Sequence, residues 1–140
     1  MSKLYLCFSA ALIFNPVTYA HAQAAPSVQT VVDACSGNDA ACSQAARDYL
    51  AALRDANLPS EQYDQGVADL VVALATTAAN DEVCDDSDRL AAAAISLAST
   101  FTTNVAQRAQ IDDIAVAVNN CTEIETAALT SPAAEAASPN

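Results

Sequence analysis

The chain has 140 residues, enough for one domain of ordinary size, and 53% of them are hydrophobic while only 5% are aromatic. Seventeen acidic side chains stand against five lysines and arginines, which gives a formal net charge of −12. Because phosphate backbones and anionic lipid surfaces recruit clusters of Lys and Arg, we expect no nucleic-acid partner and no membrane-surface partner.

The first 22 residues have the organisation of a secretory signal peptide. Lys3 precedes an apolar run from Leu4 to Phe14, and a small Ala-His-Ala exit follows. The run is much shorter than the roughly 20 residues that a membrane-spanning helix needs. We therefore expect cleavage near Ala22, with Ala24 as the alternative site. There would be no membrane insertion after cleavage, and the mature protein would be periplasmic or extracellular.

Cleavage would also remove the groups that most enzymes use near neutral pH. After residue 22 the chain has no His, Lys, Met or Trp, and four arginines face all seventeen carboxylates, a net charge of −13. Without imidazole or amine side chains, Ser-His-Asp and Cys-His arrangements and Schiff bases are excluded. Carboxylate chemistry needs two facing carboxyl groups, whereas the adjacent Asp112 and Asp113 diverge around a helix. We expect a non-enzymatic protein without a cofactor.

The apolar spacing and the abundance of alanine predict an all-α fold. A short N-terminal helix is expected over 27–35. Four main helices follow, and their predicted starts are Asp39 as an N-cap, Ser60, the segment 85–87, and Asn104. Residues 23–129 form the predicted helical domain, and residues 130–140 lack apolar periodicity, so we predict a disordered tail there.

The last two predicted helices each have a stripe of apolar residues at helical spacing. The predicted inward residues are Leu90, Ala94, Leu97, Ala98 and Phe101 in the first of them, and Ile111, Ile114, Ala115, Val118 and Cys121 in the second. Gln107, three residues after Asn104, resembles the reciprocal partner in a capping box. The pattern leaves open whether the last helix breaks at Asn119 and Asn120 or continues through Leu129.

Short connections make consecutive helices antiparallel neighbours, so the sequence predicts a small up-down helical bundle. The alternating directions bring Cys35, Cys42, Cys84 and Cys121 to one pole. Four cysteines in an exported chain of this size are typical of two disulfides. We expect the pairs Cys35–Cys42 and Cys84–Cys121, although the clustering leaves the other two connectivities open. A metal or redox site is disfavoured because Cys-x-x-Cys spacing and a mature His are both lacking.

The segment NDEVCDDSDR surrounds Cys84 with five carboxylates. They are Asp81, Glu82, Asp85, Asp86 and Asp88. An EF-hand loop starting at Asp81 would need Gly at its sixth position and Glu at its twelfth, where the chain has Asp86 and Ala92. The carboxylates after Cys84 better suit a helix N-terminus, where they cap free amides and meet the positive end of the dipole. A weak calcium site at the five residues is the alternative.

These observations favour an exported, acidic, non-enzymatic helical protein that serves as a protein-binding or structural module for an unidentified protein partner. The alternative function is weak calcium binding or solvation by an acidic surface, and a carboxylate-based enzyme is a second alternative. The aromatic residues after residue 22 are Tyr49, Tyr63 and Phe101. All three lie at helical positions that predict packing in the core, so we do not expect the hydroxyls of the two tyrosines to be reactive.

Reduction of the disulfides is expected to abolish the cooperative thermal transition. Alanine-rich faces bury few methylene groups, each worth about 0.8 kcal/mol, whereas a disulfide contributes roughly 2 to 4 kcal/mol. Two cross-links would therefore be a large share of the roughly 5 to 15 kcal/mol that holds a domain folded. Circular dichroism melts with and without excess dithiothreitol check this, and an unchanged melting temperature would contradict it.

Overall fold

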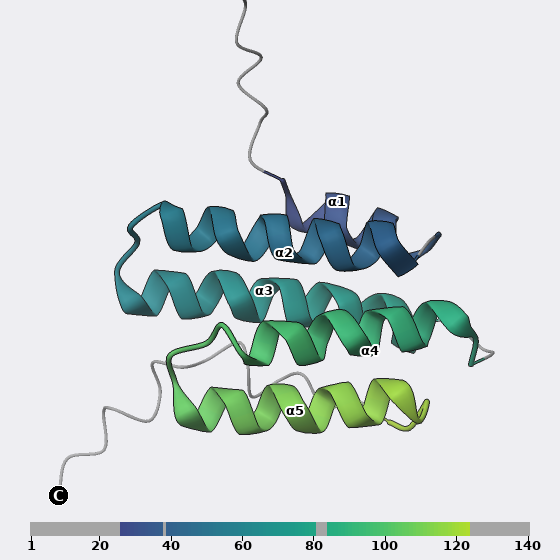
Figure 1. The fold of residues 1–140 in the computed structure, drawn as a ribbon. Helices are drawn as coiled ribbons and strands as arrows, with labels where there is room; N and C mark the ends of the chain where they lie inside the picture. The colour runs from purple at the N-terminus through teal and green to yellow at the C-terminus, as the bar shows by residue number, and fades with distance from the viewer. Residues whose placement is uncertain (1–25, 38, 81–83, 124–140) are drawn as a thin grey trace, which may run out of the picture.

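The computed structural model describes residues 26–37, 39–80 and 84–123, and they form an all-α bundle without strands among these residues. The helices are α1 (Val28–Cys35), α2 (Asp39–Asp55), α3 (Ser60–Ala79), α4 (Asp86–Ser99) and α5 (Val105–Asn119). Consecutive helices run in opposite directions (Figure 1). The predicted all-α class and the up-down bundle with a short first helix are confirmed. The predicted signal peptide and tail lie outside the described residues.

Side-chain caps explain where three of the helices begin. Ser27 accepts a hydrogen bond from the Thr30 amide at 3.2 Å, Asp85 caps α4, and Asn104 caps α5. Asp39, expected as a cap, is instead the first residue of α2, where its charge still meets the positive end of the helix dipole. The last described helix, α5, ends at Asn119. Of the two alternatives that the sequence left open, the break at Asn119 and Asn120 is therefore the correct one.

The centre of the bundle is α4, which contacts each of the other four described helices. Ile95 is fully buried on it together with its small neighbours, although the sequence prediction did not place this residue in the core. Leu90, Leu97 and Phe101, which we expected to point inward, are only half-buried against the core. Ala94 and Ala98 are buried as predicted, so the expected stripe is right at its small residues but omits Ile95.

The apolar face of α5 agrees with the prediction except at Cys121, and α3 also buries a continuous apolar face. Their buried residues include Val67, Leu70, Val71 and Leu74 on α3, and Ile111, Ile114, Ala115 and Val118 on α5. Cys121, the last residue of the predicted α5 stripe, is exposed because the helix has ended before it. None of the helices in the described part of the chain combines the length and apolar character needed to cross a bilayer.

Gly66 allows α2 and α3 to approach closely. A Cβ atom at this position would lie 2.8 Å from Leu53 Cδ2. Tyr49 crosses the same interface, and its hydroxyl donates a hydrogen bond of 3.1 Å to the Gly66 carbonyl. The predicted packing role of Tyr49 is confirmed by its low exposure of 9%.

A buried carboxylate, Asp64, fastens the start of α3 to the connection between α4 and α5. Its Oδ1 accepts hydrogen bonds from the Thr103 amide and the Thr102 hydroxyl, both at 2.9 Å, and its Oδ2 accepts from the Thr103 hydroxyl at 2.7 Å. The Gln107 side chain donates to the Asp64 carbonyl at 2.9 Å. We call these four residues the Asp64 pole. Gln107 therefore does not complete the predicted capping box; it holds α5 against α3.

Replacing Asp64 by alanine is expected to destabilise the protein by roughly 2 to 4 kcal/mol. Hydrogen bonds to a charged acceptor each contribute roughly 1.5 to 3 kcal/mol, and the substitution leaves buried donors without a partner. Urea unfolding followed by circular dichroism measures the change. The matched control is Asp69→Ala on the exposed side of the same helix, for which we expect a change below about 0.5 kcal/mol. Equal effects of the two substitutions would show that the Asp64 hydrogen bonds are dispensable.

Candidate functional site

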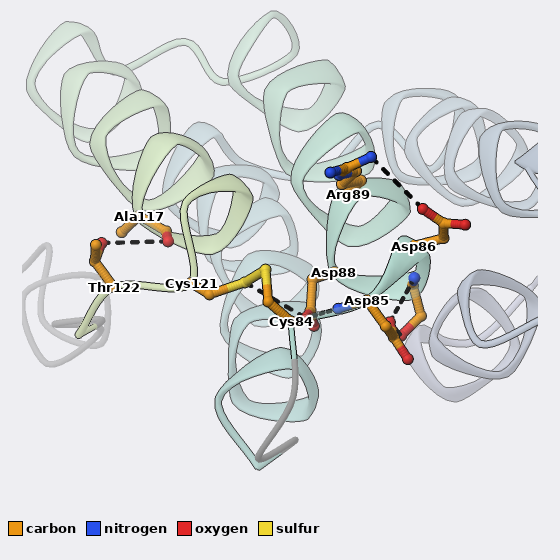
Figure 2. Close-up of a disulfide and its surroundings, with 9 residues drawn as sticks. Cys84, Asp85, Asp86, Asp88, Arg89, Ala117, Cys121 and Thr122 are labelled. Carbon is orange, nitrogen blue, oxygen red and sulfur yellow. Dashed lines mark hydrogen bonds and ion pairs between the residues drawn. A yellow bond between two sulfur atoms is a disulfide. The ribbon is translucent and has the colours of Figure 1, made fainter.

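Two disulfides join the helix ends at one pole of the bundle. Cys35 at the end of α1 pairs with Cys42 in the first turn of α2, with their Cα atoms 4.3 Å apart. Cys84, just before α4, pairs with Cys121, just after α5, with a Cα separation of 5.8 Å. The predicted connectivity is confirmed. We call these four residues the cysteine pole, and Figure 2 shows the disulfide between Cys84 and Cys121 with its acidic surroundings.

The backbone at the end of α5 aims Cys121 toward α4. The Thr122 amide donates to the Ala117 carbonyl at 3.0 Å, and the Cys121 amide donates to the Val118 carbonyl at 3.1 Å. These two bonds form a Schellman motif, whose left-handed position is usually glycine. Cys121 occupies that position with φ of 51°. The left-handed backbone alone would favour glycine at position 121, so the disulfide accounts for the cysteine there.

Asp85 uses its carboxylate to cap α4. Its Oδ1 accepts hydrogen bonds from the Ser87 hydroxyl at 2.6 Å and from the Ser87 amide at 2.7 Å. The bond from the Ser87 side chain, then that from the Ser87 backbone, and to a smaller extent one from the Asp88 backbone, lower the pKa of Asp85 below its ordinary value. The predicted capping role of Asp85 is confirmed.

The other carboxylates of the acidic segment do not converge with Asp85. Asp86 points toward Arg89, and the two charged groups lie 3.6 Å apart on the exposed surface. Asp88 turns in the opposite sense, toward the disulfide, as Figure 2 shows. Asp81 and Glu82 lie outside the described residues. The three described members of the candidate calcium set thus face a helix terminus, solvent and the bundle interior.

Asp88 is the buried member of the segment, with an exposed fraction of 3%. Its Oδ2 accepts a hydrogen bond from the Asp85 amide at 3.1 Å and lies 3.6 Å from Cys121 Sγ. A disulfide sulfur carries no hydrogen, so the second distance is a contact and not a hydrogen bond. Oδ1 is buried and has no hydrogen-bond partner among the described residues. Asp88 is therefore a buried carboxylate with one unused oxygen.

A small cavity adjoins Asp88 between α1, α3 and α4. It has room for about one water molecule. Three hydroxyl-bearing residues, Ser36, Thr77 and Ser87, line it together with Asp88. The hydroxyls already donate to nearby acceptors, and their oxygens retain the capacity to accept.

Among the described residues, one group brings metal-ligating atoms together. It consists of Cys84, Asp88 and Cys121, whose ligand atoms all lie within 4.8 Å of one another. In the disulfide the two sulfurs are bonded to each other, and thiolates are the form that binds metals. Sequence reasoning considered the cysteines and the carboxylates separately and so did not combine these three. The sequence does contain a signal for this grouping, because Asp88 comes four residues, or about one helical turn, after Cys84.

The tyrosines offer no reactive hydroxyl. Burial raises the pKa of the Tyr49 hydroxyl, and the negative charge of Asp69 raises it further. Burial likewise raises the pKa of Tyr63, with Asp64 adding to the rise and Arg54 opposing it. Both hydroxyls therefore stay protonated near neutral pH, as their predicted packing role requires.

A second candidate site is a groove between α4 and α5, on the outside of the bundle. Its volume is about 280 Å³, and it is lined by Arg89, Ala92, Ala93, Ser96, Ala115, Val116 and Asn119. Val116 is 60% exposed, which is high for a residue of this size and polarity. Asp112 and Asp113 are exposed one turn earlier on α5. We call this surface the α4–α5 groove. Its lining consists mainly of small apolar side chains, and Arg89 is its charged member.

Comparison of the chain with protein-family models, with curated proteins and with solved structures finds no match. The functional proposals below therefore depend on the residues and their geometry alone.

The N-cap at Asp85 is expected to make stability fall in acid. Because the folded-state pKa of Asp85 is lowered, its contribution is present above the unfolded value of about 3.9 and is lost as the pH falls through the lower folded value. Asp85→Asn keeps a capping oxygen but does not titrate, so its melting temperature should lie below that of the wild type at pH 6 and approach it below about pH 4.

Ser87→Ala provides the second arm of this experiment. It removes the hydroxyl that contributes most to lowering the pKa of Asp85. Asp85→Asn would be added to Ser87→Ala, and the melting temperatures of the single and double variants compared from pH 6 to pH 2. The pH dependence of their difference should be smaller than that of the difference between wild type and Asp85→Asn. A difference between wild type and Asp85→Asn that stays constant from pH 6 to pH 2 would show that this cap does not titrate with folding.

Proposed function

We propose that the protein is exported and acts as a non-enzymatic protein-binding module, which uses the α4–α5 groove to bind a partner protein with a basic surface. The leader-like first 22 residues support export. The two disulfides support it as well, because such cross-links persist mainly in oxidising compartments.

The observation that carries the proposal is the exposure of Val116 at the edge of the groove. Val116 is 60% exposed and lies beside small alanine side chains, so a partner side chain could come close to both helix backbones. Isolated apolar residues are common on surfaces, but an apolar residue within a concave surface is typical of binding sites. At the start of the same helix, Val105 is 77% exposed. The outer side of α5 thus offers a second apolar contact beyond the groove.

The charge of the surface specifies the chemistry of the partner. Asp112 and Asp113 are exposed on α5 one turn before Val116, while Arg89 is a cation among the residues that line the groove. After loss of the leader the whole chain would carry a charge of −13. A second copy of the chain would be repelled by this field, whereas a protein with exposed Lys and Arg would be attracted and steered to the groove. The proposed partner is therefore a basic protein that inserts a small apolar side chain beside Val116.

The absence of His and Lys after residue 22 supports the non-enzymatic part of the proposal. The residues left for catalysis would be carboxylates. Asp64 is occupied by three donors, and Asp85 is occupied by Ser87. Neither carboxylate is presented to a substrate.

The test compares two variants that each add one negative charge. Val116→Glu places a carboxylate in the α4–α5 groove, and binding the partner would then require desolvation of that charge. We expect affinity for the partner to fall by at least about tenfold, which corresponds to about 1.4 kcal/mol. Proteins captured from the exported fraction of the source cells by immobilised wild-type protein would be identified and their dissociation constants measured. Binding should also weaken as salt is raised, because the partner is basic.

The matched control is Thr30→Glu. Thr30 is exposed in the first turn of α1, a helix that has no contact with α5 among the described residues. Glu at this position can form a capping box with Ser27, so the variant should fold at least as well as the wild type. A partner bound equally by wild type and Thr30→Glu but lost with Val116→Glu supports the proposal. Equal binding by all three proteins, or no protein that follows this pattern, overturns it.

A further inference from the structure

We propose that Cys84, Cys121 and Asp88 form a zinc site when the disulfide between the two cysteines is reduced. The proposal is independent of the α4–α5 groove and of any protein partner. It gives the cysteine pole two mutually exclusive states, one held by a sulfur–sulfur bond and the other by a metal ion.

The three ligand atoms are close enough to reach one zinc ion after a small movement. They are within 4.8 Å of one another. In a tetrahedral site, Zn–S bonds of about 2.3 Å and Zn–O bonds of about 2.0 to 2.2 Å place neighbouring ligand atoms roughly 3.5 to 3.8 Å apart. The carboxylate is already 3.6 Å from Cys121 Sγ, so the main change is separation of the two sulfurs after their bond is broken.

Asp88 supplies an observation that points to a cation independently of the cysteines. Only 3% of its surface is exposed, and its Oδ1 has no hydrogen-bond partner among the described residues. A buried carboxylate with an oxygen that has no donor is costly. The oxygen that faces Cys121 Sγ is Oδ2, which also accepts the hydrogen bond of 3.1 Å from the Asp85 amide, the kind of supporting bond that orients carboxylate ligands. A zinc ion bound beside Oδ2 would offset the charge of the whole carboxylate, including the part that Oδ1 carries without a donor.

The two disulfides differ in how easily a reductant could reach them. Cys84 and Cys121 are exposed, whereas Cys35 and Cys42 are 3% and 1% exposed. A dithiol reductant would transfer two electrons and two protons to the Cys84–Cys121 bond, forming two thiols, and would itself become a disulfide. Zn²⁺ would then displace the two thiol protons and form two Zn–S bonds, with Asp88 as the third ligand and water as the fourth.

The donor set favours zinc over calcium or magnesium. Thiolates are soft ligands that select zinc and similar ions, whereas calcium and magnesium require oxygen ligands. Reduction without metal would leave two thiols beside a buried carboxylate, and ionising them there would gather like charges. Zinc lowers that obstacle because its two positive charges offset most of the three negative charges of the ligands, so reduction and zinc binding should promote each other.

The experiment is calorimetric titration of the processed, exported protein with zinc chloride, before and after treatment with dithiothreitol and removal of the excess under argon. The reduced protein should bind one zinc ion with an affinity at least about 100-fold above that of the oxidised protein, and zinc should restore the cooperative thermal transition that reduction alone is expected to abolish. Asp88→Asn should weaken zinc binding to the reduced protein by at least about tenfold. The control Asp86→Asn changes an exposed neighbouring carboxylate and should leave the affinity unchanged.

Cys35→Ser/Cys42→Ser tests whether the buried pair is responsible instead. Zinc binding that persists in this double variant and requires Asp88 supports the site. Since the variant could fail to fold, alkylation of the reduced wild-type protein by iodoacetamide gives a second measurement, read by mass spectrometry. Zinc should slow modification of Cys84 and Cys121 more than that of Cys35 and Cys42. Equal protection of all four cysteines, equal zinc affinity of oxidised and reduced protein, or an unaffected Asp88→Asn variant would each overturn the proposal.

Discussion

Alanine-rich helix faces bury few methylene groups, and this limit determines how the bundle is held together at its ends. The central helix α4 buries mainly alanines around Ile95. Helices can approach closely on such faces, but each small side chain contributes little transfer free energy. The two ends of the bundle are therefore fastened by other interactions. Disulfides hold the cysteine pole, and hydrogen bonds to a buried carboxylate hold the Asp64 pole at the opposite end of α3 (Figure 1).

The helices and the disulfide pairing were predictable because both follow from regular geometry. Apolar residues at helical spacing define α3 and α5, and antiparallel succession brings the four cysteines together. The Asp64 pole was not predictable, because its polar residues have ordinary local roles in the sequence. Asp64 follows the first turn of α3, and nothing in its local sequence distinguishes it from an exposed acid. Thr102 and Thr103 carry no motif in the sequence, whereas their hydroxyls donate to Asp64. These hydrogen bonds join residues that are separated by 38 or 39 positions in the sequence, and no local pattern contains such a contact.

The prediction for α4 was only partly right. Ala94 and Ala98 are buried as expected, but the expected stripe omitted Ile95. Helix α4 contacts all four of the other described helices, as α3 also does, so its buried residues extend beyond one stripe. Ile95 fills the interior, while Leu90 and Leu97 cover its edges. The same arrangement leaves alanines along the outer junction with α5, so one property of α4, its small side chains, produces both the thin core and the α4–α5 groove.

Three carboxylates close together in the sequence have three different environments at the cysteine pole. Asp85 precedes the helix and caps it, Asp86 faces solvent beside Arg89, and Asp88 faces the interior. Because each helical residue turns by about 100°, a dense acidic segment at a helix start cannot direct all its oxygens at one point. Acidic density is therefore a poor guide to a metal site in this segment. What distinguishes Asp88 is its burial next to two cysteines, with an oxygen that no described donor reaches. The same residue that stabilises the start of α4 is thereby the one whose chemistry depends on whether Cys84 and Cys121 are bonded to each other.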